Sequence, residues 1–151
     1  MIVIASDHGG LELKEALKGL LLEKGVACQD LGPCDGTSVD YPDFGQQVAR
    51  RVSEGSAQLG ILVCGTGIGM SIVANKFPGI RAALATDVFM ATMAKEHNNA
   101  NILVLGGRVI DAAAARSMVA AWLDTEFAGG RHQARLDKIT VLENELKLQA
   151  V

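Results

Sequence analysis

Five short apolar segments recur along the chain, and most are followed by a stretch with helical periodicity. The expected strands cover residues 2–5, 26–31, 61–64, 81–85 and 102–105. The expected helices cover residues 11–24, 88–97, 112–123 and 131–148, with two more starting at Tyr41 and after Cys64. Strands that alternate with helices form a parallel sheet with helices on both faces. The pattern predicts an α/β fold, a Rossmann-like three-layer α/β/α sandwich with a five-stranded parallel sheet.

The whole chain, residues 1–151, is expected to form a single domain, because no repeat, low-complexity tract or linker divides it. Hydrophobic residues make up 49% and aromatic residues only 4%, which favours this fold over a β-sandwich. The last helix, at about 131–148, has an apolar stripe of its own, formed by Leu136, Ile139, Leu142 and Leu146. We expect that stripe to pack on a partner subunit.

Charge and targeting signals narrow the possible partners. A formal net charge of −3 argues against a nucleic-acid surface. Met1 leads directly into the first strand, and no apolar run is long enough for a membrane span. We therefore expect a soluble cytoplasmic protein with no membrane or nucleic-acid partner. Cys28, Cys34 and Cys64 form no CxxC pair and are odd in number, so a disulfide framework is not expected.

The glycine-rich stretch after the third strand is the strongest functional signal. Cys64 ends the strand, and glycines alternate after it at positions 65, 67 and 69. Glycines let several backbone N–H groups point at an anion, and the start of the next helix adds partial positive charge. The same field favours the thiolate of Cys64. A thiol base beside an oxyanion-binding loop suits proton abstraction next to a carbonyl.

Two other interpretations of this stretch stay open. A cysteine at the end of an apolar strand is often only part of the core. The loop could also bind a dinucleotide, with Asp87 near the position of a ribose-binding acid. That fingerprint requires glycine at the sixth position, however, and counting from Gly65 the sixth residue is Met70.

Polar residues also follow the first and fifth strands, as Asp7, His8 and Arg108. Ligands of such sheets bind at the carboxyl ends of the strands, so these residues are site candidates. Asp7 could instead cap a helix, and His97, at the end of the fourth helix, could instead satisfy the helix dipole.

Arg131, His132 and Arg135 open the last helix. Arg131 and Arg135 are four residues apart and share a face, where their charge opposes the helix dipole and calls for an anion. A phosphate fits, although ion pairs with surface acids would also satisfy the arginines. A metal site built from the histidines and Cys64 is disfavoured, because no two of them have a short ligand spacing.

Several motifs occur in an order typical of one family. They are residues 6–10, Ser-Asp-His-Gly-Gly; 38–43, Ser-Val-Asp-Tyr-Pro-Asp; 64–69, Cys-Gly-Thr-Gly-Ile-Gly; 74–76, Ala-Asn-Lys; 96–98, Glu-His-Asn; and 129–132, Gly-Gly-Arg-His. Together they resemble the RpiB/LacAB sugar-phosphate isomerase family over nearly the whole chain. The resemblance implies an aldose–ketose isomerase that interconverts ribose 5-phosphate and ribulose 5-phosphate without metal or cofactor.

The resemblance also implies roles for individual residues. Cys64 would move the proton between C2 and C1. Thr66 would hydrogen-bond the sugar oxygens or relay a proton, and Asp7 and His97 would assist ring opening. The implied substrate-binding residues are His8, Tyr41, Gly65, Gly67, Ile68, Gly69, Asn98, Arg108, Arg131, His132 and Arg135. Within that set, the glycine loop would hold the enediolate, and His8 and the three arginines would hold the phosphate.

Some members of this family have a glutamate base where Met70 stands, so the chain resembles the cysteine-dependent branch. Family members act as dimers or tetramers with shared sites, which implies a homo-oligomer here. Isomerases of galactose 6-phosphate or allose 6-phosphate remain alternatives, as does a non-catalytic protein that binds a sugar phosphate or nucleotide.

Overall fold

The computed structural model describes residues 1–149 and contains one sheet of five parallel strands. The strands are β1 (Ile2–Ser6), β2 (Cys28–Asp30), β3 (Leu59–Cys64), β4 (Ala82–Leu84) and β5 (Ile102–Gly106), in the spatial order β2-β1-β3-β5-β4. The predicted fold class is confirmed. Because β1, β3 and β5 are neighbours, Ala5 pairs with Leu62 and Cys64 pairs with Gly106. The carboxyl ends of these three strands therefore lie side by side.

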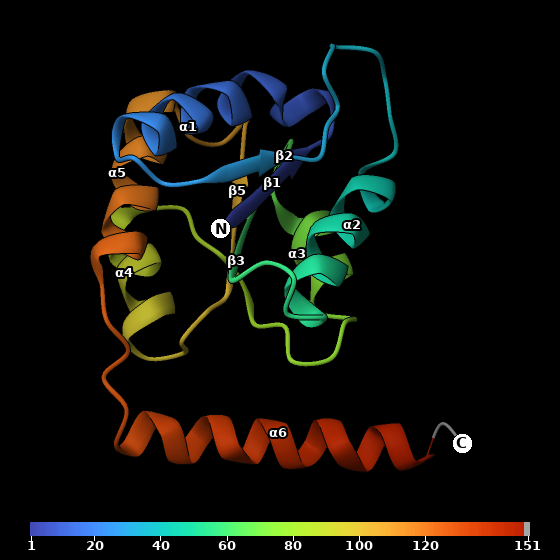
Figure 1. Cartoon of the computed structure of the whole chain (residues 1–151), viewed down its shortest axis with the longest axis vertical. Coiled ribbons are helices and arrows are strands. Elements are labelled where there is room, and N and C mark those ends of the chain that lie inside the picture. The colour runs from blue at the N-terminus through green and yellow to red at the C-terminus, as the bar shows by residue number, and fades with distance from the viewer. Residues whose placement is uncertain (150–151) are drawn as a thin grey trace.

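Helices cover both faces of the sheet (Figure 1). They are α1 (Leu11–Glu23), preceded by the 3-10 turn η1 (His8–Gly10), α2 (Tyr41–Ser53), α3 (Ile68–Ala74), α4 (Val88–Glu96), α5 (Ala112–Asp124) and α6 (Arg131–Gln149). One core cluster joins α1, α4 and α5 to one face, and a second joins α2 and α3 to the other. Alternate strand residues enter the two clusters, as the pleat requires. Cys64 belongs to the cluster under α2 and α3.

The edge strand β4 is closed by a side chain instead of another strand. The Asn75 side chain donates from Nδ2 to the Ala82 carbonyl and accepts from the Ala82 N–H, both at 2.9 Å. An amide side chain can satisfy both groups of one backbone residue, so it imitates one rung of a ladder. The edge is thereby protected against pairing with another chain.

The last helix, α6, lies away from the sheet and its covering helices (Figure 1). Leu136 is buried, whereas Ile139, Leu142 and Leu146 are more than half exposed. A groove of about 290 Å³ separates this part of α6 from the Gly79–Arg81 turn, and Glu143 accepts the Gly79 N–H across it at 2.7 Å. The stripe is present, and its expected packing on a partner stays a prediction. None of the helices within residues 1–149 combines the length and the apolar character needed to cross a bilayer.

Candidate active site

The residues predicted after β1, Asp7 and His8, meet the glycine loop after β3 at the carboxyl edge of the sheet. The Asp7 N–H donates to the Val63 carbonyl at 3.1 Å, so the turn after β1 is attached to β3. The third group joins through β5, because Gly107 N–H donates to the Cys64 carbonyl at 2.8 Å and Arg108 N–H to the Gly65 carbonyl at 2.9 Å. This is the edge at which parallel sheets bind their ligands, next to the point where strand order reverses.

Cys64 lies at the centre of this edge with 5% of its surface exposed. The Gly67 N–H points at its sulfur, with 3.1 Å between N and Sγ. A hydrogen bond of this kind is strongest when the acceptor is an anion. Gly67 is also the residue before α3, so the sulfur sits at the positive end of a short helix.

The backbone around Cys64 offers free donors. The N–H groups of Gly65, Thr66 and Gly69 have no acceptor among residues 1–149. Thr66 is exposed, and its Oγ1 accepts the Ile68 N–H at 3.3 Å. A substrate oxygen that approaches Cys64 can therefore be met by backbone donors whose geometry is already set, the arrangement that stabilises a developing oxyanion.

Gly67 makes this turn possible. Its φ is +82°, in the left-handed region, and a Cβ there would lie 2.5 Å from Leu84 Cδ1 and 3.1 Å from the Leu105 carbonyl carbon. We expect Gly67→Ala to lower the free energy of unfolding by about 1–3 kcal/mol, because both strain and overlap must be relieved. Denaturant melts would measure the loss. Gly36→Ala, where a Cβ meets nothing within 4 Å, is the control. Equal stability of the two variants would contradict this view of the turn.

The Arg108 side chain lies over two glycines of the site. A Cβ on Gly65 would come within 3.4 Å of one guanidinium nitrogen, and a Cβ on Gly9 within 3.3 Å of the other. Within residues 1–149 no carboxylate lies within 4.0 Å of this guanidinium. Arg108 is thus an exposed cation beside the free N–H groups, as expected of a residue that receives a phosphate or another anion.

Asp7, His8 and Tyr41 complete this edge. Asp7 is 9% exposed and accepts the Gly10 N–H at 3.0 Å, so the capping role considered from the sequence is present. His8 is exposed, and its Nδ1 accepts the Val39 N–H at 3.2 Å. The ring of Tyr41, the first residue of α2, packs on Gly69, where a Cβ would lie 2.6 Å from it. Tyr41, one of the expected substrate-binding residues, therefore lies next to the glycine loop.

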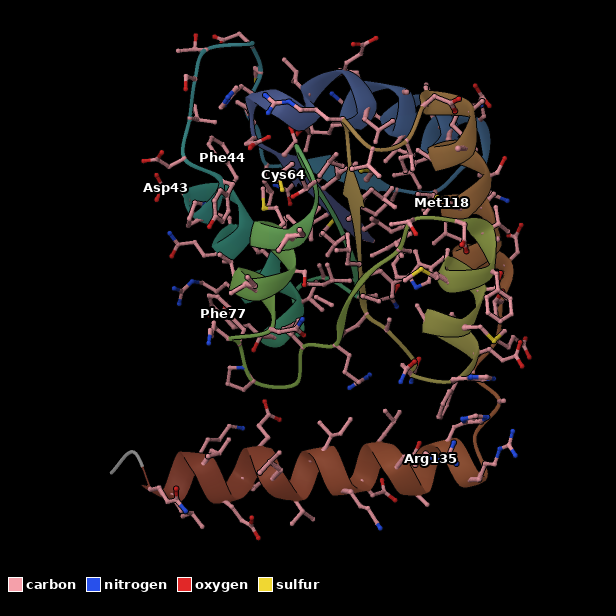
Figure 2. All side chains as sticks on the ribbon, turned by 180° about the vertical axis from the view of Figure 1, so that it is seen from behind. Asp43, Phe44, Cys64, Phe77, Met118 and Arg135 are labelled. Carbon is pink, nitrogen blue, oxygen red and sulfur yellow. The ribbon has the colours of Figure 1, made fainter. Side chains whose placement is uncertain are left out.

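The remaining predicted residues lie at the opposite edge. Figure 2 shows Cys64 in the upper part of the molecule and Arg135 on α6 at the bottom. His97 ends α4, ahead of β5, and β5 alone spans about 13 Å. Arg81 fixes the turn after His97 by donating to the carbonyls of Asn98, at 3.0 Å, and Asn99, at 2.9 Å. One chain therefore does not bring His97, Asn98, Arg131, His132 and Arg135 to Cys64.

These residues form a compact group of their own around two stacked rings. The imidazoles of His97 and His132 lie 4.1 Å apart with an interplanar angle of 11°. His132 is buried, while Arg131 and Arg135 are exposed and have no carboxylate within 4.0 Å in the described part of the chain. Glu96 lies 3.7 Å from His97 Nε2, but Arg131 and Arg135 leave the group with net positive charge, which suits an anionic ligand.

The pKa of His132 is lowered, first because burial disfavours its charged form and then because His97, Arg131 and Arg135 repel a proton. Glu96 opposes this shift. A histidine whose pKa is lower in the folded state leaves the unfolded chain with more bound protons below about pH 6.5. We therefore expect the free energy of unfolding to fall between pH 7.5 and 5.5. In His132→Phe, which keeps a ring on His97, the fall should be smaller. Chemical denaturation at both pH values measures this. An equal change in the free energy of unfolding in wild type and His132→Phe would contradict it.

The sequence matches the ribose/galactose isomerase family over residues 2–139. The chain is 42% identical to ribose-5-phosphate isomerase B of Escherichia coli (strain K12), over 94% of this chain and 95% of that protein. It is 41% identical to a D-erythrulose-4-phosphate isomerase of Pectobacterium atrosepticum, over 98% of each protein.

Two solved structures share the fold closely. Ribose-5-phosphate isomerase B of Clostridium thermocellum has a TM-score of 0.94 at 50% identity, over 96% of this chain and 98% of that one. The enzyme of Mycoplasma genitalium, solved with bound ribulose-5-phosphate, has a TM-score of 0.92 at 44% identity, over 95% and 96%. These likenesses extend over the sheet, both helical layers and the glycine loop. The chain belongs to the RpiB/LacAB family of ribose/galactose isomerases and is a sugar-phosphate isomerase.

Proposed function

We propose that the protein interconverts D-ribose 5-phosphate and D-ribulose 5-phosphate through an enediolate, with Cys64 as the base. The observation that carries this proposal is a buried thiol beside three backbone N–H groups and the Arg108 guanidinium, none of which has a partner within residues 1–149. The identity to the Escherichia coli and Mycoplasma genitalium enzymes supports this choice of substrate.

In the aldose-to-ketose direction, the Cys64 thiolate removes the proton from C2. The C2–H electron pair then forms the C1–C2 double bond, and the negative charge moves to the C1 oxygen. The free N–H groups of the loop stabilise that charge where it develops, and Thr66 hydrogen-bonds the sugar oxygens. The thiol then returns the proton to C1, and the proton on the C2 oxygen passes to the C1 oxygen as C2=O forms, which gives the ketose with its C1 hydroxyl.

A second copy of the chain supplies the other half of this site. His97, Asn98, Arg131, His132 and Arg135 together are called the His97–Arg135 group. In the proposed dimer, this group of one copy faces the Cys64 edge of the other. A two-fold interface creates two such sites at once, because each copy contributes one half to each site. Asp7 and His97 then assist ring opening, Asn98 binds a reacting oxygen, and Tyr41 borders the sugar. The phosphate is held by His8 and Arg108 together with Arg131 and Arg135, with His132 nearby.

The direct test is to incubate the purified protein with a panel of four-, five- and six-carbon aldose phosphates and measure ketose formation. The proposal predicts the highest kcat/KM for ribose 5-phosphate. A higher value for a six-carbon phosphate, or for the four-carbon substrate named for the Pectobacterium relative, would reassign the substrate within the family. Binding without turnover of any sugar on the panel would contradict catalysis itself.

We expect EDTA to leave turnover unchanged. Within residues 1–149, no three side chains among His, Cys, Asp and Glu gather closely enough to hold a metal ion. The chemistry above also needs only a base and hydrogen-bond donors. The measurement is the initial rate before and after exhaustive chelation. Loss of turnover that a divalent ion restores would reassign the histidines as ligands.

A further inference from the structure

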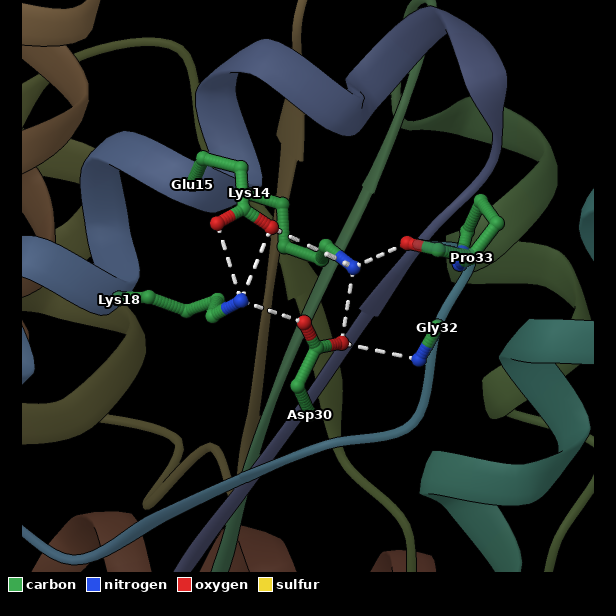
Figure 3. A network of polar contacts seen from close by, with 6 residues as sticks. All are labelled: Lys14, Glu15, Lys18, Asp30, Gly32 and Pro33. Carbon is green, nitrogen blue, oxygen red and sulfur yellow. Dashed lines mark hydrogen bonds and ion pairs between the residues drawn. The ribbon is translucent and has the colours of Figure 1, made fainter. Parts of the chain in front are cut away.

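Lys14 is completely buried in the first turn of α1, although its side chain carries a charge. Its Nζ donates to Asp30 Oδ1 at 2.8 Å and to the Pro33 carbonyl at 2.6 Å (Figure 3). Asp30 also accepts the Gly32 N–H at 2.9 Å. Burial alone would raise the pKa of Asp30, but the donors Lys14, Lys18 and Gly32 hold it below its usual value. Lys14 thus clamps α1 to the segment that follows β2.

The same two parts of the chain are joined a second time, at the active-site edge. His8 belongs to η1, which continues directly into α1, and its Nδ1 accepts the N–H of Val39 from the segment after β2. One bridge is buried and charged, and the other is exposed, neutral and 3.2 Å long. Charge-assisted hydrogen bonds are the stronger kind, so the Lys14 bridge is the stronger of the two.

The segment between the bridges has little other support. Residues 34–38 are exposed, and among residues 1–149 their only hydrogen bond is internal, from Thr37 N–H to Asp35 Oδ1 at 2.9 Å. The position of Val39 therefore depends on its two ends, the clamp at Pro33 and the start of α2 at Tyr41.

The Val39 contact determines the tautomer of His8. A backbone N–H can only donate, so Nδ1 must be the acceptor and a neutral ring must carry its proton on Nε2. His8 then presents an Nε2–H donor away from the Val39 contact. Such a donor, and not a bare nitrogen, is what a phosphate oxygen needs.

We propose that Lys14 is a positioning residue that, by clamping Asp30 and Pro33, keeps Val39 on His8 and so holds His8 as an Nε2–H donor for the substrate phosphate. The part of this proposal that concerns the substrate rests on the proposed function. Lys14 itself acts only through the segment that it holds.

The test compares Lys14→Met with Lys18→Met in protein labelled with ¹⁵N histidine, at a pH where His8 is neutral. Lys18 is the matched control because it also bonds Asp30, at 2.7 Å, yet donates no hydrogen bond to Pro33 in the described part of the chain. Wild type and Lys18→Met should show the Nε2–H tautomer of His8 in long-range ¹H–¹⁵N spectra. Lys14→Met should show a mixture with the Nδ1–H form. It should also raise KM for ribose 5-phosphate by about two- to tenfold, with kcat within about threefold, because only part of the population then offers Nε2–H to the phosphate.

An unchanged His8 tautomer in folded Lys14→Met would overturn the proposal. If that variant does not fold, Lys14→Gln, which keeps an N–H₂ donor but loses the charge, provides the same readout. The spectra require no substrate. A wild type that shows the expected tautomers but does not turn over ribose 5-phosphate would therefore refute the proposed function and leave the positioning role of Lys14 standing.

Discussion

Cys64→Ser is expected to lower kcat for ribose 5-phosphate by about 10²–10⁴-fold, the usual loss when an acid–base group is removed. A serine hydroxyl fits the same space and can accept the Gly67 N–H that points at the sulfur, so the fold should be kept. It is nevertheless far too weak a base at neutral pH to take a C–H proton. The buried Met70, in the first turn of α3, offers no substitute carboxylate.

The measurement is kcat at saturating substrate together with the melting temperature. Cys34→Ser, a matched change at an exposed cysteine outside the site, controls for the loss of a thiol as such. Turnover of Cys64→Ser close to that of wild type would remove Cys64 from the mechanism.

Arg135→Ala is expected to raise KM for phosphorylated sugars by about ten- to a hundredfold, since a hydrogen bond to a charged group is worth roughly 1.5–3 kcal/mol. Arg135 is exposed and has no carboxylate within 4.0 Å in residues 1–149, so its removal should hardly change the melting temperature. The neighbouring positive charges of the His97–Arg135 group would even repel one another less in the variant.

The comparison uses KM, or the inhibition constant of inorganic phosphate, in Arg135→Ala and in Lys147→Ala. The second variant makes the same change of charge near the other end of α6. Free ribose should bind equally well to all forms because it has no phosphate. An unchanged KM combined with a large drop in melting temperature would make Arg135 structural and leave the phosphate to His8 and Arg108.

The sheet and its helices could be predicted because their determinants are local. An apolar run followed by a helical stripe specifies a strand and a helix without reference to the rest of the chain. The largest difference concerns β2, predicted over 26–31 and observed only at Cys28–Asp30. The Val26 N–H donates to the Leu21 carbonyl, just after the end of α1, so it does not pair with β1. The glycine loop was equally predictable, because its shape depends on residues that adjoin in sequence.

The division of the site into two groups could not be predicted from spacing. A helix that follows a parallel strand returns to the amino ends of the strands, so the end of α4 lies at that edge, but the position of α6 beside it is set by tertiary packing. The stack of His97 on His132 likewise joins two helices that are not consecutive in the chain. Sequence reasoning also missed the Val39 N–H on His8, because a backbone donor has no side-chain signature. Lys14 did leave a signal, since it lies in the apolar stripe with Leu17 and Leu21, where a charge needs a buried partner.

The most direct test of a site shared between two copies is the activity of a hybrid dimer. Cys64→Ser and Arg135→Ala chains, each with a different affinity tag, are expressed together, and the hybrid is isolated through both tags. If Cys64 of one copy works with Arg135 of the other, one of the two sites in the hybrid carries neither change. The hybrid should then show about half of the wild-type kcat/KM, far above either parent. A hybrid whose activity equals the mean of its two parents would mean that each site is built within a single chain.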